Sequence, residues 1–290
     1  MRFSPARQGR MGRKTASFPA FRDVMEPSPT LVQVYEIQTP REALSMAGAG
    51  VDRIGSVLVS QREWKVPELR ETLDEARALG LGTSLIPLFS DLSAVCRVLD
   101  FYRPEVVHFC EVLSGPRAAK AGDLVRLQEE VGRRFPGIAR MRTIPFAPPG
   151  LGHRVPSLAL AGLFAPVSEL FLTDTVPVTV PGVRTFQDPV TGFVGITGRT
   201  CDWALARRLV RQSPIPVILA GGISPENALD AVLTTRPAGV DSCTLTNILD
   251  NRGRPVRFAK DPARVAAMVA AVRRADRLLG RARLHPLPEG

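Results

Sequence analysis

Short apolar runs alternate with longer amphipathic stretches along the chain from residue 31 onward. The runs predict eight strands, at 31–35, 53–59, 83–87, 106–110, 139–144, 169–173, 216–220 and 239–243. Most positions within each run are apolar, rather than every second one. This pattern is typical of parallel strands that are buried on both faces.

The stretches between these runs predict helices. Two helices are predicted to begin at Thr39 and at Ser224. The others are predicted at 67–79, 92–102, 118–134, 158–163, 202–212 and 261–274. Thr39 precedes Pro40, and Ser224 precedes Pro225. A Thr or Ser hydroxyl can accept hydrogen bonds from the free N–H groups of a first turn, and proline suits the first helical position. Both pairs therefore predict helix starts.

Eight strand-then-helix units between residues 31 and 274 predict a closed (β/α)₈ barrel, the TIM-barrel fold. We expect one α/β domain over residues 30–274, with the crossover helices outside the strands. A doubly wound open sheet is the alternative arrangement of the same units. A barrel would place the chemistry in the loops that follow the strands, at their carboxyl ends.

The charge of the chain is concentrated at its ends. The formal net charge is +10, of which residues 1–29 carry +4 and residues 273–290 carry +3, so the body is nearly neutral. We expect a flexible basic leader over residues 1–29 and a basic C-terminal tail over residues 275–290. Basic tails can bind nucleic acid or acidic membranes. More often they are solvated extensions, so a nucleic-acid partner is not expected.

The composition excludes several classes of protein. Apolar residues make up 44% of the chain and charged residues 23%, the usual balance of a globular protein and not of a disordered or fibrous one. The chain has no apolar run of about 18 residues, which a membrane-spanning helix would need. Residues 1–29 lack the apolar core of a secretory signal, so a cytoplasmic location is expected. The four cysteines are far apart and no Cys–His cluster occurs, which predicts reduced thiols and no metal site.

Polar, reactive and glycine residues lie near the carboxyl ends of the predicted strands and in the loops after them. They are Tyr35, Glu36, Arg62, His108, Cys110, Asp174, Gly221, Gly222, Cys243 and Thr244. Gly221 and Gly222 are the most informative, because a glycine after a barrel strand lets backbone N–H groups approach an anion closely. The seventh and eighth loops of such barrels commonly bind phosphate. The pair therefore predicts a phosphate site, with a tight turn as the other explanation.

Several short segments form an ordered series of motifs. They read VQVYEIQTPREA (32–43), AGVDRIG (49–55), VVHFCE (106–111), FLTDT (171–175), GITGRTCDW (195–203), PVILAGGISPEN (216–227) and GVDSCT (239–244). In sequence and order they resemble the phosphoribosylanthranilate isomerase family. The corresponding family segments read V-K-I-C-G-I-T, A-G-A-D-A-I-G, V-V-Q-L-H-G, F-L-L-D-S, G-G-T-G-K-T-F-D-W, a nearly identical seventh-strand motif and G-V-D-V-S-S. The resemblance covers about residues 32–274.

The resemblance implies an isomerase of tryptophan biosynthesis that acts on a phosphorylated ribose derivative. The reaction is an Amadori rearrangement, in which an aminoaldose phosphate becomes an aminoketose phosphate. It needs an acid at the ring oxygen and a base at the C2 proton, without a metal or an organic cofactor. Asp174 matches the family's acid, a role that requires burial to raise its pKa above about 4. Capping of a turn is the other role open to Asp174.

The base of the family, a cysteine at the end of the first strand, is absent. Tyr35 occupies its position, and Glu36 replaces the neighbouring glycine. His108 and Cys110 share one face of the fourth strand, which by the resemblance points into the barrel mouth. The base therefore stays open among Tyr35, Glu36, His108 and Cys110. An interior histidine and a small buried thiol are the non-catalytic explanations of His108 and Cys110.

The resemblance also implies which residues bind the substrate. The expected phosphate and substrate contacts are Gly195, Thr197, Gly198, Gly221, Gly222, Cys243 and Thr244. Leu245 stands where the family has a glycine after the eighth strand. Arg62 is the nearest equivalent of the arginine that binds the anthranilate carboxylate in the family, in a segment shorter by about one residue. An arginine can bind a carboxylate through two hydrogen bonds; a surface arginine is the alternative.

Two other functions fit the same residues. The first is a diverged barrel that keeps the phosphate pocket but binds or converts a different phosphorylated ligand. Loss of the cysteine and of the strand-eight glycine favours it. The second is a non-catalytic scaffold whose basic tails contact a partner. The leading hypothesis expects a small phosphorylated substrate, a monomer or homodimer, and no membrane partner.

Overall fold

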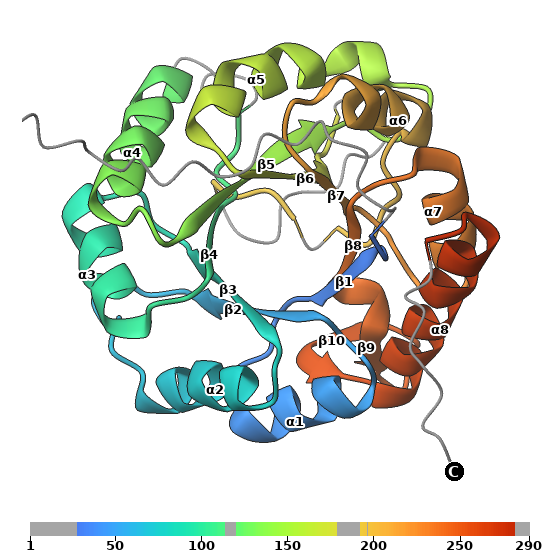
Figure 1. Cartoon of the computed structure of the whole chain (residues 1–290), viewed down its shortest axis with the longest axis horizontal. Helices are drawn as coiled ribbons and strands as arrows, with labels where there is room; N and C mark the ends of the chain where they lie inside the picture. The colour runs from blue at the N-terminus through green and yellow to red at the C-terminus, as the bar shows by residue number, and fades with distance from the viewer. Residues whose placement is uncertain (1–27, 114–119, 179–191, 196, 282–290) are drawn as a thin grey trace, which may run out of the picture.

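Eight parallel strands close into a barrel that is surrounded by helices (Figure 1). The computed structural model describes residues 28–113, 120–178, 192–195 and 197–281. The strands are β1 (Leu31–Val34), β2 (Arg53–Leu58), β3 (Gly82–Pro87), β4 (Val106–Phe109), β5 (Ala139–Phe146), β6 (Leu170–Thr175), β7 (Val217–Leu219) and β8 (Gly239–Ser242). Each strand pairs in parallel with the next, and β8 pairs with β1. The predicted barrel is confirmed, and the open sheet is excluded.

A helix follows each strand and packs against the outside of the barrel (Figure 1). The helices are α1 (Pro40–Gly48), α2 (Pro67–Ala78), α3 (Leu92–Tyr102), α4 (Ala121–Arg134), α5 (Ser157–Phe164), α6 (Trp203–Gln212), α7 (Ala228–Thr235) and α8 (Pro262–Leu278). Within the described ranges, no helix is long and apolar enough to cross a membrane.

Side-chain caps fix several helix starts. Thr39 Oγ1 accepts from Glu42 N at 3.2 Å, and Glu42 Oε2 accepts from Thr39 N at 3.0 Å, so the start predicted at Thr39 is a complete capping box. The predicted contact of Ser224 is present, because Ser224 Oγ accepts from Glu226 N at 3.2 Å. The regular helix starts later than predicted: Ser224 N donates to Asn227 Oδ1 at 2.9 Å, which closes a turn, and α7 begins at Ala228.

The C-terminal helix is longer than predicted. We expected it to end at 274, but α8 continues to Leu278, into the segment expected to be a basic tail. Buried residues of α8 such as Val272 and Ala275 extend its apolar face beyond the expected end. Residues 1–27 and 282–290, which contain most of the predicted leader and tail, lie outside the described residues.

The sequence pattern did not predict the antiparallel hairpin between β8 and α8. Its strands are β9 (Asn247–Leu249) and β10 (Pro255–Lys260). Asp250 Oδ1 accepts from Arg254 N at 2.8 Å and closes its turn. Figure 1 shows the hairpin beside the barrel, close to β1. It brings residues of β10 against the loop that follows β1.

Alternate residues of each strand face opposite sides of the barrel wall. In β1, Val32 and Val34 are fully buried among the residues between the strands and the helices. Tyr35, one residue after β1, belongs to the separate cluster inside the barrel. A Cβ added to Gly55 would lie 2.1 Å from the Tyr35 ring, so the bulk of Tyr35 depends on a glycine in β2.

Candidate active site

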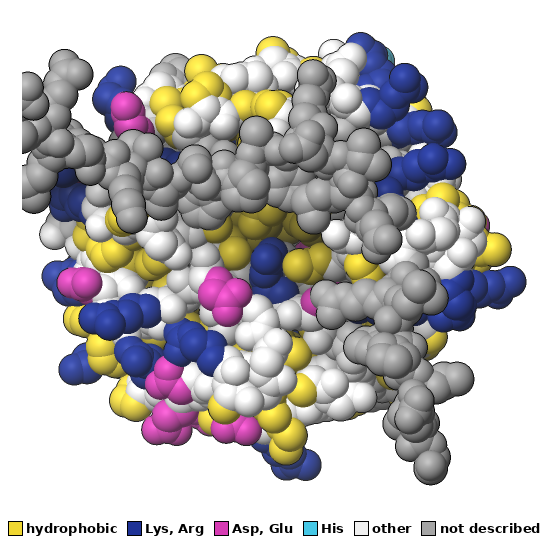
Figure 2. Space-filling view, in the orientation of Figure 1, with side chains coloured by type: hydrophobic (Ala, Val, Ile, Leu, Met, Phe, Trp, Pro, Cys, Tyr) yellow, Lys and Arg dark blue, Asp and Glu magenta, His cyan; other side chains and the backbone are white. Residues whose placement is uncertain are grey.

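Two adjoining cavities lie at the carboxyl ends of the strands. The glycine cavity, of about 300 Å³, is lined by residues that include Thr197, Gly198, Gly221, Gly222, Thr244 and Leu245. The apolar cavity, of about 570 Å³, is lined by residues that include Tyr35, Glu36, His108, Cys110, Phe193 and Gly195. Of the described residues, Asp174, Asp241 and Cys243 line both. Figure 2 shows hydrophobic, basic and acidic side chains together near the centre of the face that is seen in Figure 1.

Glycines let two loops meet at the glycine cavity. Gly221 and Gly222 have positive φ angles, of 89° and 65°. A Cβ on Gly222 would lie 2.5 Å from the backbone of Arg199 and Thr200, and one on Gly221 would lie 2.5 Å from Thr175 Oγ1. Only glycine therefore lets the loop after β7 pack against the loop before α6. Closely packed backbone of this kind can bind a phosphate through its N–H groups.

Asp174 lies at the end of β6, where the two cavities meet. Its Oδ1 accepts from Thr175 N at 2.7 Å. A Cβ on Gly195 would lie 2.9 Å from Asp174 Oδ2, so glycine at 195 lets the loop backbone approach the carboxylate. The sequence predicts that this carboxyl group and the Gly221–Gly222 pair share one rim of the barrel. The structure places them around one cavity.

A hydrogen-bonded chain fixes Tyr35 and His108 inside the barrel. Tyr35 Oη lies 2.6 Å from Ser84 Oγ and 2.7 Å from His108 Nδ1, and His108 Nε2 lies 2.7 Å from Thr143 Oγ1. Burial lowers the pKa of His108 to about 3, and the charge of Arg142 adds to this effect. Burial raises the pKa of Tyr35 well above its usual value. At neutral pH both rings are therefore uncharged and held in place.

The buried His108 makes stability depend on pH. Its pKa of about 3 in the folded protein compares with about 6.5 in an unfolded chain, so as pH falls below 6.5 the unfolded state gains a proton that the folded state does not. We expect His108 to cost about 1.4 kcal/mol of unfolding free energy per pH unit below 6.5. The test is urea unfolding of the wild type and of His108→Gln at pH 7.5 and at pH 5. Between these pH values, the difference in unfolding free energy between the two proteins should change by about 2 kcal/mol in favour of the variant. An unchanged difference between the two proteins at both pH values would contradict this.

The thiols near the site, Cys110 and Cys243, are uncharged at neutral pH. Burial raises the pKa of Cys110, and the charge of Glu111 raises it further. Cys243 Sγ lies 4.0 Å from Lys260 Nζ, yet burial still raises the pKa of this thiol. All four cysteines are free in the structure.

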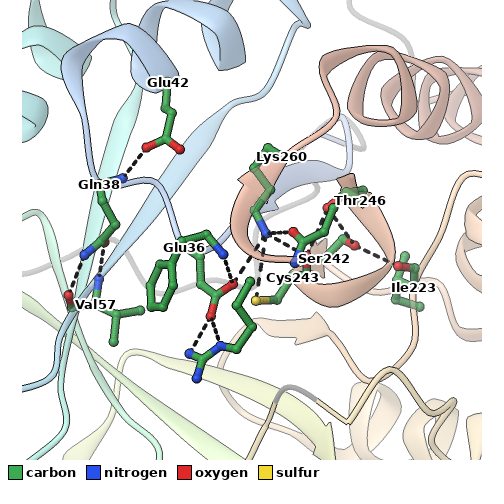
Figure 3. Close-up of polar contacts among 12 residues, drawn as sticks. Glu36, Gln38, Glu42, Val57, Ile223, Ser242, Cys243, Thr246 and Lys260 are labelled. Atoms are coloured by element: carbon green, nitrogen blue, oxygen red, sulfur yellow. Dashed lines mark hydrogen bonds and ion pairs between the residues drawn. The ribbon is translucent and has the colours of Figure 1, made fainter. Parts of the chain in front are cut away.

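Glu36 is buried in an ion-pair network formed with the hairpin (Figure 3). Its Oε1 accepts from Arg257 Nη2 at 2.6 Å and Nε at 2.9 Å, and its Oε2 accepts from Phe258 N at 3.2 Å. Lys260 Nζ lies 4.0 Å away. The φ of Glu36 is 64°, in the left-handed region that favours glycine. The contacts with β10 hold a glutamate in a conformation that it would otherwise rarely adopt.

Asp241 is a site residue that the sequence interpretation missed. It faces the barrel interior from β8, and its Oδ1 accepts from Gln33 Nε2 at 3.0 Å. Burial raises the pKa of Asp241 to about 7; the charge of Asp174 acts in the same direction, while Gln33 and the charge of Lys260 oppose it. The available signal was its position in GVDSCT, two residues before Cys243 and therefore on the same strand face.

The structure does not bring Arg62 to either cavity. It is exposed in the loop after β2 and lines neither the glycine cavity nor the apolar cavity. Thr197, Gly198, Cys243 and Thr244 do line the glycine cavity. Over the described ranges, no group of three His, Cys, Asp or Glu residues is placed to hold a metal ion.

In sequence the chain is similar to phosphoribosylanthranilate isomerases. The family model "N-(5'phosphoribosyl)anthranilate (PRA) isomerase" matches residues 184–244. The N-(5'-phosphoribosyl)anthranilate isomerase of Methanothrix thermoacetophila is 29% identical over 245 residues, which are 84% of this chain and 98% of that relative. The enzyme of the same name from Methanocella arvoryzae is 26% identical over 74% of this chain and 88% of its own length. The chain is therefore similar to phosphoribosylanthranilate isomerases over most of its length.

Solved structures of phosphoribosylanthranilate isomerases share the barrel. TrpF from Jonesia denitrificans has a TM-score of 0.57 at 22% identity and covers 85% of this chain and 98% of its own. The enzyme from Thermotoga maritima has a TM-score of 0.59 at 17% identity, with coverage of 84% and 98%. At these identities the likeness shows the fold.

The chain departs from the motif of the similar phosphoribosylanthranilate isomerases where β1 ends. The Cys-Gly pair is replaced by Tyr35 and Glu36, and both are locked by neighbours, one by His108 and the other by Arg257. The two substituted side chains are therefore both hydrogen bonded to residues of other strands, His108 of β4 and Arg257 of β10.

Proposed function

We propose that this protein is a phosphoribosylanthranilate isomerase of tryptophan biosynthesis, which converts N-(5'-phosphoribosyl)anthranilate to its aminoketose isomer. The observation that carries the proposal is the meeting of the glycine cavity and the apolar cavity at Asp174. The substrate has a phosphate at one end and an aromatic ring at the other. With its two ends in the two cavities, the ribose would lie beside Asp174.

The two cavities divide the binding of the substrate. In the proposed mode, backbone groups of Gly198, Gly221 and Gly222 bind the phosphate, and the Thr197 and Thr244 hydroxyls lie at the same cavity. Apolar side chains, Leu88 and Phe193 among them, line the cavity that would take the aromatic ring. Arg62 lines neither cavity, and its contact with the anthranilate carboxylate stays a prediction.

Asp174 is the proposed general acid. It would donate a proton to the ring oxygen of the sugar, so that the bond between C1 and this oxygen breaks and a C1–N double bond forms. A base then removes the proton on C2, which gives an enolamine. The C2 hydroxyl loses its proton and C1 gains one, giving the ketone. Atoms and electrons balance within the substrate, so the reaction needs no cofactor.

The four groups predicted as possible bases all have other partners or low basicity in this structure. Tyr35 and His108 are hydrogen bonded to one another, Glu36 is paired with Arg257, and burial keeps the pKa of Cys110 high. The roles of these four residues stay predictions. Their environments suit positioning and packing better than proton transfer.

Turnover by the purified protein tests the function. We expect it to convert N-(5'-phosphoribosyl)anthranilate, measured by chromatography of the product, and to restore growth without tryptophan to a strain that lacks the isomerase. A folded protein that binds inorganic phosphate but does not turn over the substrate would favour the diverged-barrel alternative. The replacement of Cys-Gly by Tyr35 and Glu36 is the observation that favours this alternative.

The oligomeric state is a separate proposal. One solved structure is of monomers of the dimeric enzyme from Thermotoga maritima. We expect a monomer or a homodimer here as well, which light scattering after size-exclusion chromatography would measure.

A further inference from the structure

We propose that Asp241 is the general base that removes the C2 proton of the substrate, in place of the cysteine that the family has after β1. This inference rests on the proposed isomerase function. It makes the catalytic pair two carboxyl groups, Asp174 on β6 and Asp241 on β8.

The position of Asp241 carries the inference. In the described part of the chain, only Asp174, Asp241 and Cys243 line both cavities. A substrate with its phosphate in one cavity and its aromatic ring in the other must pass its reacting carbons by these residues. Asp241 faces the interior from β8, two strands away from Asp174, so the two carboxyl groups approach the ribose from different parts of the rim.

The carboxylate is held by one oxygen. Gln33 Nε2 donates to Oδ1 at 3.0 Å, and among the described residues no donor to Oδ2 is found. Gln33 is itself placed by Arg53 of β2, whose Nη1 lies 3.4 Å from Gln33 Oε1. Oδ1 is thereby fixed by Gln33, and Oδ2 is left for a ligand. A general base needs an oxygen within hydrogen-bond reach of the proton that it removes.

Burial and the surrounding charges set the pKa of Asp241 close to neutral pH. Burial raises its pKa to about 7, and the negative charge of Asp174 contributes, because two nearby carboxyl groups resist ionising together. Gln33 and the positive charges of Lys260 and Arg53 act in the opposite direction. The buried Tyr35 hydroxyl is uncharged at this pH. At a pH near the pKa of Asp241, a large fraction of Asp241 is ionised, and the ionised carboxylate can accept a proton.

The alternative base at the same place is the Cys243 thiol. It lines both cavities and lies 4.0 Å from Lys260 Nζ, which would stabilise a thiolate. However, Lys260 Nζ is already shared by the backbone oxygen of Cys243 at 2.7 Å and by Asn247 Oδ1 at 2.5 Å, and burial keeps the pKa of the thiol high. Asp241 is therefore the group that can accept a proton at neutral pH.

The proton transfer is internal to the reaction. After ring opening, an Asp241 oxygen takes the C2 proton, and the C–H electron pair becomes the C1–C2 double bond as the C1–N double bond becomes a single bond. The enolamine then tautomerises, and C1 receives a proton. The carboxylate is regenerated when that proton leaves Asp241, so no external oxidant or reductant is needed.

Asp241→Asn is the first test, with Asp230→Asn, an exposed change in the first turn of α7, as the matched control. We expect Asp241→Asn to lower kcat by about 10²- to 10⁴-fold, the usual contribution of a general base. The rise of kcat/KM with pH, centred near 7 in the wild type, should disappear from its residual activity. Asp241→Ala should regain turnover when formate is added, which a purely structural role of Asp241 would not allow.

Isotope effects separate the base from the acid. With substrate deuterated at C2, Asp241→Asn should show a larger isotope effect on kcat than the wild type. Asp174→Asn should show a smaller one, because ring opening then limits the rate. Wild-type-like kcat in a folded Asp241→Asn, or loss of turnover and of the pH dependence in Cys243→Ser alone, would overturn the assignment of Asp241 while the isomerase function stands. Failure of the wild-type protein to turn over the substrate would overturn both.

Discussion

Asp174→Asn is expected to lower kcat for N-(5'-phosphoribosyl)anthranilate by about 10²- to 10⁴-fold, the range over which a positioned general acid contributes. The asparagine keeps the size of the side chain and can still accept from Thr175 N, as Asp174 Oδ1 does at 2.7 Å. What it lacks is the proton for the ring oxygen. Steady-state turnover of the purified variant measures the effect.

The control for this prediction separates chemistry from binding. KM should change much less than kcat, because Asp174 lies where the cavities meet and the phosphate is assigned to the glycines beyond it. Asp100→Asn, an exposed change in α3, should leave both constants unchanged. If Asp174→Asn turned over substrate at the wild-type rate, the acid would have to be another group at this boundary.

The barrel could be predicted from sequence because its strands are buried on both faces. Runs such as 216–220 and 106–110 have no polar face to confuse with a helix, and the structure has a strand in each. The hairpin of β9 and β10 was missed for the opposite reason. Its strands are short and Leu249 and Val256 are about half exposed, so no apolar pattern marks them. The helix start predicted at Ser224 came early, because Ser224 caps a turn that precedes the regular helix α7.

The site could be predicted only as far as strand ends and glycines mark it. Asp174 and the Gly221–Gly222 pair follow strands, so the barrel fold alone places them on one rim. Asp241 could not be recognised in that way, because its pKa depends on burial and on charges from other strands and from β10. Likewise, nothing near Glu36 in the sequence indicates Arg257, which is 221 residues away.

Arg142→Met is expected to lower the free energy of unfolding by about 3–5 kcal/mol, the usual cost of removing one partner of a buried ion pair. Arg142 is fully buried in β5, with Nη1 2.5 Å from Glu111 Oε2 and Nη2 2.7 Å from the Glu111 backbone oxygen. Its guanidinium lies 4.7 Å from the centre of the Phe164 ring. Methionine keeps much of this packing but leaves the Glu111 carboxylate without its cation. Denaturant unfolding at pH 7 measures the loss.

Replacing both partners tests whether the unpaired charge is the cause. Arg142→Met combined with Glu111→Gln should recover a large part of the lost stability, since no buried charge then remains. Arg126→Met, which breaks an exposed ion pair with Asp123, should change stability little.

The ion pair between Arg142 and Glu111 also matters for the site. Ser90 donates to Glu111 at 2.6 Å, and the backbone of Glu111 forms a β-bridge with Phe193, which lines the apolar cavity. If Arg142→Met were destabilised but the double variant no better, packing around Phe164 and not the charge would explain the loss. A raised KM in the folded fraction of Arg142→Met would show that the same ion pair shapes the cavity proposed for the aromatic ring.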